Sequence, residues 1–170
     1  MPAPIIDGLI TFLSAQVDAN IWDGEVPRYS PAGNPINPES TITGPSDWPV
    51  IKLWMKEDGF ERNWNFIDPY DDLGEILIQV WTTSHNALED PTSGLLNIIE
   101  ALLAQSGNWA LIDLGNGGGG TSGNPYYVVS VILKRWYSGM EEGKRTAKSE
   151  YIYRGDMHYQ VRIHGAIPTR

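Results

Sequence analysis

The chain has 170 residues, of which 41% are hydrophobic and 19% are charged, a balance typical of one folded domain with its own core. Its net charge of −9 argues against nonspecific binding to the outside of DNA, and the absence of cysteine excludes disulfides and thiolate metal sites. No apolar run approaches the roughly 20 residues of a membrane span, and the first residues lack the positive charge of a signal peptide. We therefore expect no membrane partner and no export by that route.

The first part of the chain alternates between regular elements and loops. Apolar residues recur at helical spacing over residues 4–17, which predicts an amphipathic helix. A short extended piece over 21–28 precedes a loop over 29–48, where four prolines and two glycines exclude a regular element. Apolar and polar residues alternate over 49–56, which predicts a strand, and the acidic segment 57–61 is expected to turn the chain.

The middle of the chain holds its most apolar segment. Residues 75–83 are rich in β-branched and aromatic residues and predict a strand that is buried on both faces or nearly so. Residues 95–105 carry an apolar stripe at helical spacing and predict a helix that covers a sheet. The apolar residues of 109–114 predict a further short strand.

The start of this second helix has two interpretations. Asn86 with Glu89 three residues later resembles a capping box. Asp90 followed by Pro91 is the better pair for the N-cap and the first helical position. If both turns are helical, Pro91 marks a kink between them.

The last part of the chain predicts an antiparallel hairpin. A Gly-rich loop over 115–125 leads into a strand over 126–137, and a polar, charged connection over 138–149 leads into a last strand over 150–165. Grouped strands with two helices indicate one domain over 1–170 of the α+β class. We expect an antiparallel or mixed sheet, two helices on one face and long protruding loops.

The charge is unevenly distributed. Residues 126–170 hold eight of the twelve Lys and Arg residues and four of the 21 acids, so this segment carries about +4 and residues 1–125 about −13. One interpretation is ordinary solvated surface. The other is two surfaces of opposite sign that meet between subunits.

The sequence contains no convincing catalytic, cofactor or metal motif. The run 115–120 matches the dinucleotide pattern G-x-G-x-x-G, but Pro125 and its neighbours prevent the helix that must follow. The run 139–145 resembles a phosphate loop but is one residue short, and Arg145 replaces the Ser or Thr that binds magnesium. We therefore predict no cofactor.

Histidines and clustered acids do not form a recognisable site either. His158 and His164 share a strand face but lie about 20 Å apart, too far to share a metal. His85 sits at a strand end without a marked nucleophile nearby. Asp68, Asp71 and Asp72 form an acidic cluster whose spacing does not match a calcium loop.

The order of the elements nevertheless resembles a known family. The matching features are the first helix, the segments 21–27 and 50–54, the strand 76–81, residues 84–86 entering a helix, and a tyrosine-rich last strand. Together they resemble the tail terminator proteins of tailed phages, also called tail-completion or head–tail joining proteins. The resemblance covers most of the chain.

This resemblance implies a structural virion protein without enzyme activity. Such α+β subunits form a ring, typically a hexamer, that caps the tail tube, ends tail elongation and joins the tail to the head connector. The implied partners are further copies of the chain, the tail tube protein and the head-side connector or stopper protein, with the tail sheath as another candidate. DNA passes through the ring without specific binding. The implied location is the neck of the virion, after assembly in the host cytoplasm.

Two groups of charged residues are candidates for roles in such a ring. An acidic lining would keep the passing duplex from sticking, because like charges repel. Its candidates are Glu57, Asp58, Glu61, Asp68, Asp71 and Asp72. The basic loop 144–148, with Lys144, Arg145 and Lys148, is a candidate contact to an acidic neighbour. Plain solvation is the alternative for both groups.

Two other functions remain open at this stage. One is another neck component, such as a head-completion connector or a stopper ring. The other, from a different class, is a small hydrolase or ligand-binding domain that uses His85 and the carboxylates of 68–72. No paired general acid and base is visible in the sequence to support the second.

Overall fold

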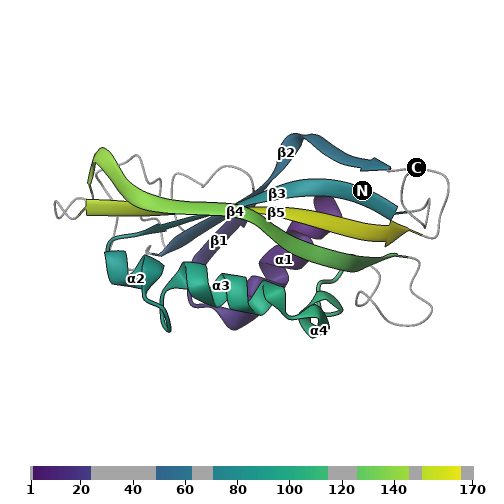
Figure 1. Ribbon diagram of the computed structural model, residues 1–170, viewed down its shortest axis with the longest axis horizontal. Coiled ribbons are helices and arrows are strands. Elements are labelled where there is room, and N and C mark those ends of the chain that lie inside the picture. The colour runs from purple at the N-terminus through teal and green to yellow at the C-terminus, as the bar shows by residue number, and fades with distance from the viewer. Residues whose placement is uncertain (1, 24–48, 63–70, 115–125, 146–150, 166–170) are drawn as a thin grey trace.

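A computed structural model describes residues 2–23, 49–62, 71–114, 126–145 and 151–165. Figure 1 shows a sheet with helices on one side of it. The elements are, in chain order, α1 (Pro2–Gln16), β1 (Asn20–Asp23), β2 (Val50–Arg62), β3 (Asp71–Thr82), α2 (His85–Glu89), α3 (Leu95–Ala104), α4 (Ser106–Trp109), β4 (Tyr126–Arg145) and β5 (Tyr151–Gly165).

The five strands form one mixed sheet in the order β1-β2-β3-β5-β4. β1 runs parallel to β2, and the other neighbouring pairs are antiparallel. β5, the last strand in the chain, lies between β3 and β4. The two edges of the sheet are therefore β1, with four residues, and β4, with 20 residues.

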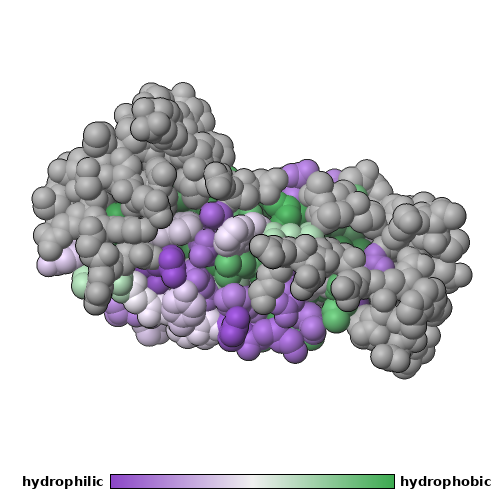
Figure 2. Space-filling model, turned by 90° about the horizontal axis from the view of Figure 1, so that it is seen from above, coloured by the Kyte–Doolittle hydropathy of each residue, from purple (hydrophilic) through white to green (hydrophobic). Residues whose placement is uncertain are grey.

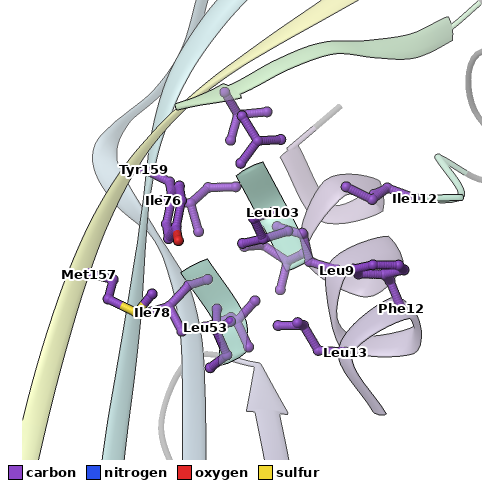
Figure 3. Close-up of a cluster of buried hydrophobic side chains, with 14 of the residues drawn as sticks. Leu9, Phe12, Leu13, Leu53, Ile76, Ile78, Leu103, Ile112, Met157 and Tyr159 are labelled. Atoms are coloured by element: carbon purple, nitrogen blue, oxygen red, sulfur yellow. The ribbon is translucent and has the colours of Figure 1, made fainter. Parts of the chain in front are cut away.

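The core lies between the helices and one face of the sheet. Alternate residues of the strands point to this face, as the period of two requires, and they are almost fully buried. In Figure 3, Leu9 and Leu13 of α1 and Leu103 of α3 lie among side chains from the strands. α1 contacts β1 and β2, while α3 and α4 contact β4. The α+β class, the mixed sheet and the helical layer on one face are as predicted from the sequence.

The strongest periodic segments were predicted closely. The helices over 4–17 and 95–105 correspond to α1 and α3, and the strands over 75–83 and 150–165 correspond to β3 and β5. The predicted terminal hairpin is also confirmed, because β4 and β5 are antiparallel neighbours. The predicted loops over 29–48 and 115–125 lie outside the described residues.

The strand predicted over 109–114 is wrong. α4 ends at Trp109, and a turn follows in which the N–H of Leu111 donates to the carbonyl of Asn108 at 3.0 Å. Ile112 and Leu114 are buried in the same core as α1. A short apolar run has the same composition whether it pairs in a sheet or only fills a core, and here it fills the core.

Two segments that were predicted as connections are parts of strands in the structure. The expected turn over 57–61 lies within β2, where the register shifts between Met55, opposite Ile76, and Phe60, opposite Gly74. β2 thus advances by more residues than β3 and bulges there, which explains the turn-like composition. The expected connection over 138–149 is strand as far as Arg145, because β4 continues beside β5.

The start of the second helix combines both interpretations. α2 is a separate short helix whose N-cap is Ser84 rather than Asn86. Asp90 then caps a single turn: one carboxylate oxygen accepts from the N–H of Thr92 and of Ser93, both at 2.9 Å. α3 begins only at Leu95, after Gly94. The break between the two helices therefore lies at residues 90–94, with Pro91 inside it, rather than forming a kink in one helix.

Candidate functional site

The open edge of β4 is the most distinctive surface of the protein. β4 pairs with β5 on one side, and within the described part of the chain no strand pairs with its other side. Ile132, Trp136, Tyr137 and Met140 are between 44% and 49% exposed along this strand. An unpaired strand with exposed apolar side chains is a template for pairing with another chain. This edge is therefore a candidate assembly surface.

Irregular pairing distributes these side chains over both faces of the sheet. Val131 and Leu133 lie opposite Val161 and Tyr159 and pack in the core. The register then shifts between Leu133 and Arg135, so that Trp136 lies opposite Met157 and Tyr137 lies opposite Asp156. The bulge changes which positions face the helices. As a result, exposed aromatic rings border the edge on both faces.

A polar network on the helix-free face fixes Tyr137 beside this edge. The Tyr137 hydroxyl donates to one carboxylate oxygen of Asp156 at 2.5 Å, and Gln79 Nε2 donates to the other at 3.2 Å. Arg154 Nε lies 3.3 Å from the second oxygen, and its Nη2 donates to the Tyr137 hydroxyl at 2.8 Å. The hydrogen bond to Asp156 is the main reason that the pKa of Tyr137 is raised above 10.0. Asp156 itself is buried.

The two edges of the sheet differ in charge. Lys134 and Arg135 are exposed on β4. At the other edge, Asp18 is exposed just before β1 begins. Figure 2 shows the helix-free face, on which hydrophilic and hydrophobic side chains are interspersed. Among the side chains whose burial the structure describes, these exposed charges at the two edges are of opposite sign.

Of the residues predicted to form an acidic lining, the structure describes the burial of Asp72 alone. Glu57, Asp58 and Glu61 lie on β2, where the register shifts, and Asp71 begins β3. Asp72 is only 6% exposed, so its carboxylate does not line an open channel in this subunit. Asp68 lies outside the described residues.

The predicted basic loop is only partly a loop. Lys144 and Arg145 are the last residues of β4, and Arg145 pairs with Tyr151 at the start of β5. Lys148 lies outside the described residues. The first two positions therefore extend the β4 edge.

The histidines and carboxylates do not come together as a hydrolase site requires. His85 begins α2, pairs with Glu89 one turn later and meets the Tyr153 ring edge-on. Asp72 lies near the opposite end of β3, roughly 33 Å away at extended-strand rise. His158 and His164 sit opposite Leu77 and Asp71, also far apart along β5. In the described ranges no group of three or more His, Cys, Asp or Glu residues is placed to hold a metal.

The exposed residues of the β4 edge were not identified from the sequence. The strand over 126–137 was predicted, but its place at the sheet edge depends on β5 lying between β3 and β4. No local pattern encodes that order. The only signal was the run of aromatic and basic residues over 134–137, which a buried strand on a two-sided sheet would not favour.

Comparison with known proteins does not identify a family. No protein-family model matches the chain, and no curated protein matches its sequence. Within the residues that the structure covers, no helix is long and apolar enough to cross a membrane.

Proposed function

We propose that this chain is the structural subunit of a ring that caps the tail tube of a tailed phage, ends tail elongation and joins the tail to the head connector. The order α1, β1, β2, β3, a helical segment, β4 and β5 is the order of elements on which the resemblance to tail terminators rests. In this proposal the protein is assembled in the host cytoplasm and resides in the neck of the virion.

The observation that carries the proposal is the open edge of β4. A strand of 20 residues with apolar side chains exposed on both faces is costly to leave in water and prone to pair with other chains. Natural proteins usually protect such edges or use them for assembly. A subunit whose role is to build a ring uses this edge in its normal function.

The charge of the chain supports further copies of itself as the partner. The segment 126–170 carries about +4 and residues 1–125 about −13. In a head-to-tail contact the basic part of one subunit meets the acidic part of the next, which favours encounter and register. Such a contact repeats around a closed ring.

All but one of the candidate acidic residues keep their role in this proposal. A ring that passes DNA benefits from negative charge on its inner surface, since repulsion keeps the duplex mobile. We keep Glu57, Asp58, Glu61, Asp68 and Asp71 as candidates for that surface, and Asp72 is excluded by its burial.

Two measurements test the proposal. The first is the solution mass by light scattering behind a sizing column, at low and moderate salt. We expect a species near six times 18.9 kDa that loses subunits as salt screens the charges. The second is cosedimentation with assembled tail tubes from the same virion. We expect the protein to sediment with the tubes and to be saturated at one ring per tube end.

The results separate the alternatives. Binding to the head-side connector but not to the tube would reassign the chain to a stopper or head-completion ring. A monomer that binds neither structure would contradict the proposal.

A further inference from the structure

We draw no further inference here: the strongest candidate, the open edge of β4 with its exposed apolar side chains, carries nothing beyond the proposed function, because nothing in the described part of the structure shows what covers this edge.

Discussion

At the scale of single residues, Asp156 is a buried carboxylate on the helix-free face with several polar partners. It is 4% exposed, and its two carboxylate oxygens have Gln79, Tyr137 and Arg154 as partners. A buried carboxylate is tolerated only when such partners replace its lost hydration. The three partners come from β3, β4 and β5, so this one side chain connects three neighbouring strands beside the open edge of β4.

Removing the Asp156 carboxylate should therefore destabilise the protein. We expect Asp156→Ala to lower the free energy of unfolding by about 2–4 kcal/mol, because it leaves donors without their acceptor. The pKa of Tyr137 should fall toward its ordinary value of 10.0, since the hydrogen bond to Asp156 is the main cause of its rise. Urea unfolding and the titration of the Tyr137 ring signal by NMR measure the two effects. Tyr137→Phe is the control, with a cost of only about 0.5–1.5 kcal/mol; equal losses in both variants would contradict this account.

Asp90 gives a prediction about pH. Hydrogen bonds from Thr92 and Ser93 lower its pKa from 3.8 to about 2. A carboxyl whose pKa is lower in the folded state stabilises the fold above its unfolded pKa, and the stabilisation is lost as pH falls through the folded pKa. At pH 7, Asp90→Ala should thus unfold at a lower urea concentration than the natural chain. The difference between the two midpoint concentrations should become smaller between about pH 4 and pH 2. A difference in midpoint that stays constant with pH would show that the charge of the Asp90 carboxylate does not contribute to stability.

At the scale of elements, two glycines set how closely the helical layer approaches its neighbours. A Cβ at Gly155 of β5 would lie 2.5 Å from the Leu96 side chain of α3. A Cβ at Gly8 of α1 would lie 2.2 Å from the backbone oxygen of Asp113. These approaches bring α3 onto the centre of the sheet and α1 against the segment after α4.

The contact at Gly155 can be tested by overpacking. Leu96 is buried, so it has little room to move, and we expect Gly155→Ala to destabilise the fold by about 1–3 kcal/mol. The double variant Gly155→Ala/Leu96→Ala should lose less than the sum of the two single variants, because the shortened side chain vacates the space. Gly139→Ala is the matched control on an exposed strand position with no atom within 4 Å. The free energy of unfolding of the four variants is measured with urea. Strictly additive losses for Gly155→Ala and Leu96→Ala would contradict direct packing between these two positions.

The sequence predicted the elements better than it predicted the surface. Long periodic segments such as α1, α3 and β5 were found because burial of one face imposes a repeat along the chain. The bulges in β2 and β4 were not found, because a bulge depends on pairing with a neighbour. The candidate site was predicted least well. Charged residues such as Lys144 and Asp72 can be read from the sequence. The position of Trp136 on an edge strand follows from the order of strands in the sheet, and the burial of Asp72 follows from which face of β3 it points to.

At the scale of the whole molecule, the arrangement is one-sided in two respects. All helices of the described chain cover the same face of the sheet, and no described helix covers the other face (Figure 1). The exposed basic residues Lys134 and Arg135 lie on the edge strand β4, and the exposed Asp18 lies just before β1, the strand at the other edge. A body whose two edges differ assembles through contacts between unlike edges, head to tail, and such contacts close into a ring only when the rotation between copies is a whole fraction of a turn.

This polarity predicts how assembly responds to charge. Lys134 and Arg135 are exposed, so Lys134→Glu/Arg135→Glu should leave the fold intact. The double variant replaces basic charge by acidic charge in the segment that the proposed head-to-tail contact brings to the acidic part of the next copy. Exposed ion pairs contribute about 0–1 kcal/mol each, so two reversals should raise the concentration needed for assembly by roughly tenfold per contact. Sedimentation velocity over a range of concentration and salt measures this.

The salt dependence gives the sharper result. The natural chain should assemble less well as salt increases, because salt screens attraction, whereas the reversed variant should assemble better, because salt screens repulsion. The control Ala101→Glu/Gln105→Glu adds acids to exposed positions of α3 and the residue after it, away from both edges, and should behave like the natural chain. If both variants weaken assembly equally, net charge rather than the β4 edge governs association, and the head-to-tail arrangement of edges loses its electrostatic support.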